Sequence, residues 1–180
     1  MSTSQESLLL AQLRETDRFL RAANIDYALI GGVAVNLHGV LRATADLDML
    51  LRAEDANAAH DALVEHGYAP IDRREDIASY IRGGERLDIL FARRPITRTL
   101  LANAAEYEVG DLRLRAISVE GLIGLKVQAL TDDPRRLKDL NDLVELFKVH
   151  RKRMDLDEIR TYFRLFDRER LLDDLLRAVD

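Results

Sequence analysis

Two aspartates separated by one residue, Asp46 and Asp48, are the residues of this sequence best placed to do chemistry. They alternate with Leu47 and Met49, which predicts a strand with both carboxylates on one face and apolar side chains on the other. Two carboxylates about 7 Å apart along a strand repel each other, and a divalent cation relieves that repulsion. Mg²⁺ takes oxygen ligands and is commonly held by one or two carboxylates together with substrate phosphates. The pair therefore predicts a magnesium–phosphate site, and a solvated edge strand is the alternative.

The same Asp-x-Asp spacing occurs at Asp155 and Asp157, so spacing alone does not mark a site. The chain carries 32 acidic residues against 27 basic ones, and in so acidic a chain such pairs arise by chance. Asp155 and Asp157 lie between a basic run and a helical pattern, where helix capping and solvation account for them. The apolar alternation around Asp46 and Asp48 separates that pair from this background.

Two adjacent glycines, Gly31 and Gly32, follow the apolar run 27–30, which predicts a buried strand that ends in a tight turn. The next residues, 33–38, are expected to form a short helix. Backbone N–H groups at such a strand-to-helix turn have no side chains in front of them, so an anion can approach. A simple tight turn is the alternative for an isolated glycine pair. Because they come one strand before the carboxylate pair, these glycines are expected to hold the phosphates of a metal–triphosphate site.

A third carboxylate, Asp88, lies between apolar residues on the second strand of a hairpin that is expected to turn at residues 83–85. A carboxylate in the middle of an apolar strand costs free energy unless it faces a site or a partner. We therefore expect Asp88 to complete the site of the carboxylate pair. An ion pair with Arg86 on an exposed face is the alternative.

A strand, a glycine pair, a short helix, two alternating aspartates and a third aspartate between apolar residues together resemble the polymerase-β-type nucleotidyltransferase superfamily. More narrowly, the pattern Arg42-x-Thr44-x-Asp46-x-Asp48 resembles small bacterial nucleotidyltransferases related to abortive-infection (AbiEii-like) toxins. The resemblance implies that Asp46 and Asp48 hold two Mg²⁺ ions. Asp88 would share one of these ions and take the proton of the acceptor hydroxyl. The triphosphate would lie against the glycine pair, with Arg42 and Thr44 also in the nucleotide-binding site.

Lys126 lies in an apolar helical stretch of a chain that has few lysines. A snorkelling lysine is one interpretation, and a cation that reaches the triphosphate is the other, which the resemblance favours. The pattern Lys138-Asp139-x-x-Asp142 also resembles the toxin-related group, and it implies that Lys138 and Asp139 bind nucleotide. Ordinary helix ion pairs, Lys138 with Asp142 and Arg135 with Asp139, account for the same residues.

The composition bounds the class of protein. A chain of 180 residues without cysteine has no disulfide, zinc–thiolate site or cysteine nucleophile. A net charge of −5 argues against a protein that coats nucleic acid through bulk electrostatics. No apolar run approaches the ~18–20 residues of a membrane span. Since residues 1–7 do not resemble a signal peptide, we expect a cytoplasmic protein that has no membrane partner.

The elements that must position these residues are expected to form an α/β (α+β) fold. Residues 1–117 carry the predicted strands and would form the nucleotidyltransferase core, for which the resemblance implies a mixed sheet flanked by helices. From Ser118, the expected N-cap of a helix, the pattern is helical, and residues 118–180 would form a C-terminal helical subdomain. Its helices are expected at roughly 119–131, 134–149, 156–166 and 168–178, the second opened by Asp133-Pro134.

These features predict an Mg²⁺-dependent nucleotidyltransferase that moves a nucleoside monophosphate from an NTP onto an acceptor hydroxyl and releases pyrophosphate. The toxin-like resemblance favours an acceptor in RNA, such as a tRNA end, or in a protein, and it implies a cognate antitoxin as a partner. An antibiotic-modifying enzyme of the same superfamily, with a small-molecule acceptor, is one alternative. A non-catalytic binding module that keeps the fold is another, although the presence of all three carboxylates weighs against it.

Overall fold

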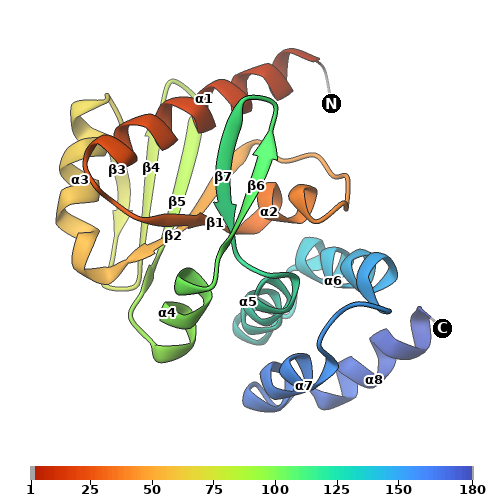
Figure 1. Ribbon diagram of the computed structural model, residues 1–180. Coiled ribbons are helices and arrows are strands. Elements are labelled where there is room, and N and C mark those ends of the chain that lie inside the picture. The colour runs from red at the N-terminus through yellow and green to blue at the C-terminus, as the bar shows by residue number, and fades with distance from the viewer. Residues whose placement is uncertain (1–2, 180) are drawn as a thin grey trace. The chain divides into compact units, whose positions relative to one another are not determined.

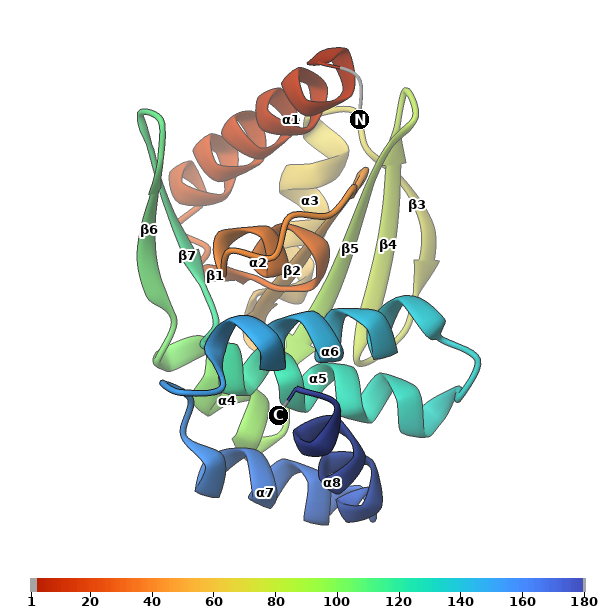
Figure 2. The same ribbon diagram turned by 90° about the vertical axis from the view of Figure 1, so that its right-hand side faces the viewer.

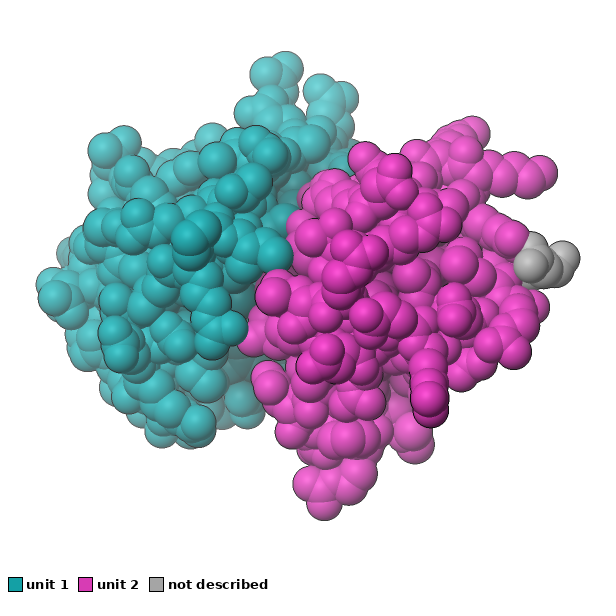
Figure 3. Space-filling view, turned by 90° about the horizontal axis from the view of Figure 1, so that it is seen from below, with its two compact units in different colours: residues 1–34, 42–117 teal, residues 35–41, 118–180 magenta. Residues whose placement is uncertain are grey.

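The computed structural model describes the backbone of residues 3–179 and the side chains of residues 8–179. The chain divides into two compact units, the first made of residues 1–34 and 42–117 and the second of residues 35–41 and 118–180 (Figure 3). The first unit contains a mixed sheet with helices and the second is helical, so the α/β class predicted from the sequence is confirmed. Residues 35–41 belong to the second unit, whereas the predicted division at residue 117 assigns them to the core.

A mixed sheet, seven-stranded within residues 3–179, forms the centre of the first unit (Figure 1). Its strands are β1 (Tyr27–Leu29), β2 (Asp46–Arg52), β3 (Ala69–Arg73), β4 (Ile77–Arg82), β5 (Glu85–Ala92), β6 (Ala105–Val109) and β7 (Leu112–Ala116). They lie in the order β3-β4-β5-β2-β1-β7-β6. β2 runs parallel to β5 and antiparallel to β1, while β1 runs parallel to β7. β5 therefore runs beside the aspartate pair, whereas β1 pairs with the residues of β2 that follow it, from Met49 to Leu51.

The apolar residues of the strands determine which face of the sheet is covered. Leu47 and Met49 of β2 are fully buried, whereas Asp46 on the other face is exposed. The helices that begin before residue 117 are α1 (Thr3–Ala22), α2 (Gly31–Leu37), the 3-10 helix η1 (Ala53–Asp55), α3 (Ala56–Glu65) and α4 (Pro95–Ala102). α1 contacts β2 and α3, and α3 contacts β3, so these two helices cover the apolar face (Figure 1).

The helices of the second unit are α5 (Val119–Asp132), α6 (Leu137–His150), α7 (Leu156–Leu165) and α8 (Glu169–Ala178) (Figure 2). The N-cap predicted at Ser118 is confirmed, because its Oγ accepts a hydrogen bond from Gly121 N at 3.1 Å. α5 packs closely on α7 at Gly124, where an added Cβ would lie 2.8 Å from Cγ of Tyr162. None of the helices in residues 3–179 combines the length and the apolar character needed to cross a membrane.

The structure differs from the prediction at three elements. Helix α6 begins at Leu137 rather than after Asp133-Pro134. The Asp133 carboxylate accepts the N–H of Arg135 at 3.1 Å, so a turn occupies the residues that were expected to open the helix. β3 is a mostly exposed edge strand without apolar alternation, and α4 is only 8 residues long, which is too short for a periodic pattern. Neither of these two elements was predicted.

Candidate active site

The parallel pairing of β2 with β5 places the three predicted carboxylates on one patch of the sheet. Asp46 is the register partner of Arg86, and Asp48 is the register partner of Asp88. Neighbouring strands lie about 4.8 Å apart, and residues two apart along a strand share a face. Asp46, Asp48 and Asp88 therefore project from the same face, with Arg86 among them.

Asp88 has two partners on this face. Ser79 Oγ donates a hydrogen bond to one carboxylate oxygen at 2.5 Å, and Arg86 Nε donates to the other at 2.9 Å. The ion pair weighed as the alternative for Asp88 is therefore present. Ser79 was not predicted, although the hairpin contains the signal: a two-residue turn at Gly83 and Gly84 pairs Ser79 directly with Asp88.

The glycine pair lies directly against the carboxylate pair. The N–H of Gly32 faces Oδ2 of Asp48 at 3.4 Å. Gly31 has a φ of +60°, and a Cβ on it would lie 2.0 Å from the same Asp48 oxygen. A Cβ on Gly32 would lie 2.4 Å from Oγ1 of Thr44 and 2.8 Å from a guanidinium nitrogen of Arg42. The structure thus brings the glycines together with Arg42, Thr44 and Asp48, and only glycine allows this approach.

Thr44 and Arg42 come from the segment that leads into β2. Thr44 is buried, and its hydroxyl donates to the carbonyl oxygen of Asp46 at 3.3 Å. Arg42 is half-buried, and Nη1 donates to the carbonyl oxygen of Ala43 at 3.1 Å. Both side chains therefore bond to the backbone at residues 43 and 46, at the start of the aspartate pair and close to the glycines.

Replacing Gly31 by alanine is expected to reduce both stability and activity. Alanine at positive φ costs about 1–2 kcal/mol, and its methyl group would also overlap the Asp48 carboxylate. Gly83→Ala is a matched control, because Gly83 has a φ of +54° and no described atom lies within 4 Å of the added Cβ. Thermal unfolding and an activity assay on both variants should show the larger losses in Gly31→Ala. Equal losses of stability would contradict the close approach to Asp48.

The donor chemistry of the carboxylate patch fits Mg²⁺, since carboxylate oxygens are its usual protein ligands. Asp46 and Asp48 provide the one or two carboxylates that such a site needs beside phosphate oxygens. Within residues 8–179, no three His, Asp or Glu side chains converge as a ready-made metal-binding group. Asp88 instead bonds to Ser79 and Arg86. The patch thus holds two candidate metal ligands, Asp46 and Asp48, and a third carboxylate, Asp88, whose oxygens are already hydrogen-bonded to Ser79 and Arg86.

The remaining predicted residues, Lys126, Lys138 and Asp139, belong to the second unit. Lys126 is buried, and its Nζ donates to Asp142 at 2.6 Å and to Asp139 at 3.0 Å. Burial would raise the pKa of Asp139, but Lys126 and Arg136, which donates to it at 2.5 Å, lower that pKa on balance. Lys138 is exposed. This buried cluster joins α5 to α6, and nucleotide binding by the three residues stays a prediction.

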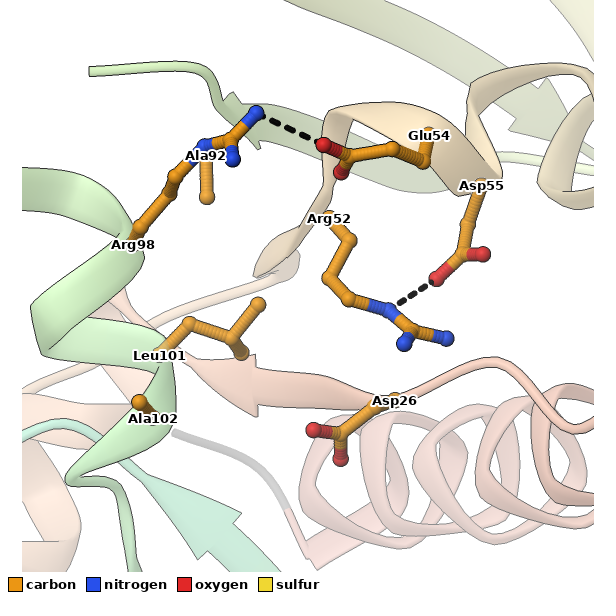
Figure 4. Close-up of a pocket in the computed structure, with 8 residues that line it drawn as sticks. All are labelled: Asp26, Arg52, Glu54, Asp55, Ala92, Arg98, Leu101 and Ala102. Atoms are coloured by element: carbon orange, nitrogen blue, oxygen red, sulfur yellow. Dashed lines mark hydrogen bonds and ion pairs between the residues drawn. The ribbon is translucent and has the colours of Figure 1, made fainter. Parts of the chain in front are cut away.

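The first unit also contains a hollow whose lining includes none of the three predicted aspartates (Figure 4). Since strands rise about 3.3 Å per residue, Arg52 at its edge lies about 20 Å along β2 from Asp46. Charged side chains in its wall pair with one another, Arg52 with Asp55 at 2.7 Å and Arg98 with Glu54 at 2.6 Å. The cavity has a volume of about 450 Å³ and is lined by Asp26, Arg52, Glu54, Asp55, Ala92, Arg98, Leu101 and Ala102. The predicted site is therefore the open carboxylate face and not this cavity.

Solved structures of known proteins share this fold. The antibiotic-resistance factor ANT(2'')-Ia is similar with a TM-score of 0.70 and 16% identity over 97% of each chain. An antigenic nucleotidyltransferase-like protein from Paracoccidioides brasiliensis has a TM-score of 0.60 and 17% identity over 99% of this chain and 94% of its own. Lincomycin-bound LnuA, a lincosamide antibiotic adenylyltransferase, has a TM-score of 0.56 and 15% identity over 83% of this chain and 98% of its own. At these identities the likeness shows the fold, which is that of nucleotidyltransferases.

The sequence profile of a family described as uncharacterised nucleotidyltransferase matches residues 1–179. The chain belongs to this family of nucleotidyltransferases. Comparison with curated protein sequences gives no match. The predicted superfamily and the predicted enzyme class are thus confirmed, while the narrower likeness to AbiEii-like toxins stays a prediction.

Proposed function

We propose that this protein transfers a nucleoside monophosphate from an NTP to an acceptor hydroxyl in an Mg²⁺-dependent reaction that releases pyrophosphate. The observation that carries the proposal is the contact of Asp48 with the glycine pair, on the face that also bears Asp46 and Asp88. A carboxylate held against this turn, with a second carboxylate beside it, suits a metal-bound triphosphate, because Mg²⁺ is held by one or two carboxylates together with phosphate oxygens. Membership in a nucleotidyltransferase family supports the same class of reaction.

The three aspartates carry the proposed chemistry. Asp46, Asp48 and Asp88 are the proposed ligands of two Mg²⁺ ions, whose chemistry here is to neutralise phosphate charge and to lower the pKa of the acceptor hydroxyl. Asp88 takes the hydroxyl proton while the oxygen attacks the α-phosphorus. The bond between that phosphorus and the bridging oxygen of pyrophosphate breaks as the new ester bond forms. Positioning and electrostatics therefore provide most of the catalysis.

The triphosphate is proposed to bind beside the glycine pair. Gly31 and Gly32 make room beside the backbone for Asp48, Thr44 and Arg42, and any side chain at the two glycines would displace these residues. Arg42 lies adjacent to Gly32, and its guanidinium can donate charge-assisted hydrogen bonds to a phosphate. Thr44 fixes the segment that leads from these residues into β2 through its bond to the carbonyl of Asp46.

The proposed acceptor is a hydroxyl of RNA, such as a tRNA end, or of a protein, with a cognate antitoxin as a partner. This choice rests on the toxin-like pattern Arg42-x-Thr44-x-Asp46-x-Asp48. A small-molecule antibiotic is the second candidate acceptor. It is favoured by the fold shared with ANT(2'')-Ia and with LnuA, which is named as a lincosamide antibiotic adenylyltransferase.

Labelled nucleotides test the reaction and separate the two acceptors. The purified protein is incubated with Mg²⁺, a cell extract and each NTP in turn, labelled either at the α-phosphate or at the γ-phosphate. We expect α-label in an RNA or protein fraction, while γ-label leaves with pyrophosphate. Label in an added antibiotic would favour the second acceptor. Transfer of γ-label, or no transfer of α-label from any NTP, would contradict nucleotidyl transfer.

A further inference from the structure

Arg86 supplies positive charge to the face that carries the three aspartates. Its Nε donates to Asp88 at 2.9 Å, and its register partner on β2 is Asp46. The pKa of the Arg86 guanidinium is raised first by the hydrogen bond and charge of Asp88, and then by the charges of Asp46 and Asp48. The guanidinium thus forms an ion pair with Asp88 on the face that also bears Asp46 and Asp48.

Asp88 is held at both carboxylate oxygens, by Ser79 on β4 and by Arg86 on its own strand. A divalent cation at Asp88 would lie beside the guanidinium that already bonds to this carboxylate. Two cations so close repel each other, so occupancy by one disfavours the other. This arrangement agrees with the finding that the side chains of residues 8–179 contain no ready-made group of three metal ligands.

We propose that Arg86 competes with the divalent cation for Asp88, so that Asp88 becomes the third ligand only when Arg86 releases it. The inference rests on the proposed function, which supplies the cation. Before the cation binds, the ion pair relieves the repulsion among the three carboxylates. After Arg86 leaves, Ser79 keeps hold of one oxygen of Asp88 and preserves its orientation. Arg86 is therefore a positioning residue that sets metal affinity.

Titration of the protein with Mn²⁺, followed by the electron paramagnetic resonance signal of the free ion, measures this competition without any turnover. Arg86→Gln is expected to bind Mn²⁺ about tenfold more tightly than the wild type, since a hydrogen bond to a charged group no longer has to break. Arg86→Lys keeps the positive charge but loses the planar set of guanidinium N–H donors, so its Mn²⁺ affinity should lie between those of the wild type and Arg86→Gln. Unchanged or weaker binding by Arg86→Gln would overturn the proposal.

A double-mutant cycle with Asp88→Asn separates the ion pair from the general effect of removing a positive charge. If Arg86 acts through Asp88, the gain from Arg86→Gln should shrink to less than about threefold in the Asp88→Asn background. An equal gain in both backgrounds would contradict the inference. Arg113→Gln is the matched control, because Arg113 is an exposed arginine on β7 whose side chain is 73% exposed. Its Mn²⁺ affinity should equal that of the wild type.

Failure of the inference is distinguishable from failure of the proposed function. Mn²⁺ binding that is lost in Asp46→Asn and Asp48→Asn, but unchanged in Arg86→Gln, would overturn only the role of Arg86. If Asp46→Asn and Asp48→Asn bind Mn²⁺ as tightly as the wild type, these aspartates do not hold the metal. That result would contradict both the metal site of the proposed function and the competition with Arg86.

Discussion

Replacing Asp46 or Asp48 by asparagine is expected to abolish nucleotidyl transfer while the protein stays folded. Each change removes a carboxylate ligand of the Mg²⁺ that would neutralise the phosphate charge, and the loss should be at least about a hundredfold in rate. The thermal midpoint should stay the same or rise, since asparagine fits the same space and relieves repulsion between carboxylates. Steady-state transfer of α-label and thermal unfolding in the absence of Mg²⁺ measure the two effects.

The second Asp-x-Asp pair provides the control for this experiment. Asp157 has a side chain that is 91% exposed and forms only a surface ion pair with Arg160. Asp157→Asn should therefore leave both the rate and the midpoint at their wild-type values. Turnover at the wild-type rate in Asp46→Asn or Asp48→Asn would refute the assignment of the site to this face of the sheet.

Replacing Lys126 by methionine is expected to destabilise the protein by about 3–5 kcal/mol, because two buried carboxylates lose their shared counter-ion. The side chain of Lys126 is 5% exposed, that of Asp142 is 2% exposed and that of Asp139 is 12% exposed. Lys138→Met is the control, because Lys138 directly precedes Asp139 in the chain but is exposed. This substitution should change the free energy of unfolding by less than about 0.5 kcal/mol. Chemical denaturation of the two variants measures the difference.

A double variant separates the structural part of Lys126 from the predicted contact with nucleotide. In Lys126→Met with Asp142→Leu, Arg136 still neutralises Asp139, so most of the stability should return. If the Michaelis constant for NTP nevertheless rises about tenfold or more, Lys126 also contributes to nucleotide binding. A wild-type constant in the stable double variant would limit Lys126 to joining α5 and α6. A double variant as unstable as Lys126→Met alone would show that the lost ion pair is not the cause.

Local sequence patterns predicted the elements that have a regular alternation of apolar residues or a capping residue. The alternation around Leu47 and Met49 predicted their burial correctly, because a strand exposes its two faces in turn. Ser118 was identified as an N-cap because a helix needs an acceptor for its first N–H groups. β3 and the late start of α6 at Leu137 were missed, since an exposed edge strand and a local turn at Asp133 leave no periodic signal.

The residues of the candidate site were predictable from the sequence, but most of the contacts among them were not. The hairpin register could have given the Ser79–Asp88 contact, because both residues belong to one local element. The contact of Gly31 with Asp48 depends instead on a positive φ and on how β1 and β2 pair, which no local pattern contains. The same holds for Lys126, whose partners lie on another helix.

The amino-acid sequence alone was sufficient for the α/β class, the nucleotidyltransferase family and the three aspartates on apolar strands. The class and the strands depend on residue types and short periods, which can be read without knowledge of the packing, and the family came from the resemblance of the motif set to known nucleotidyltransferases. Tertiary structure was needed to show that Gly31 lies against Asp48, and that Lys126 lies between two carboxylates. The interaction of two charged groups depends on the distance between them, and that distance is set by strand register and helix packing rather than by spacing along the chain.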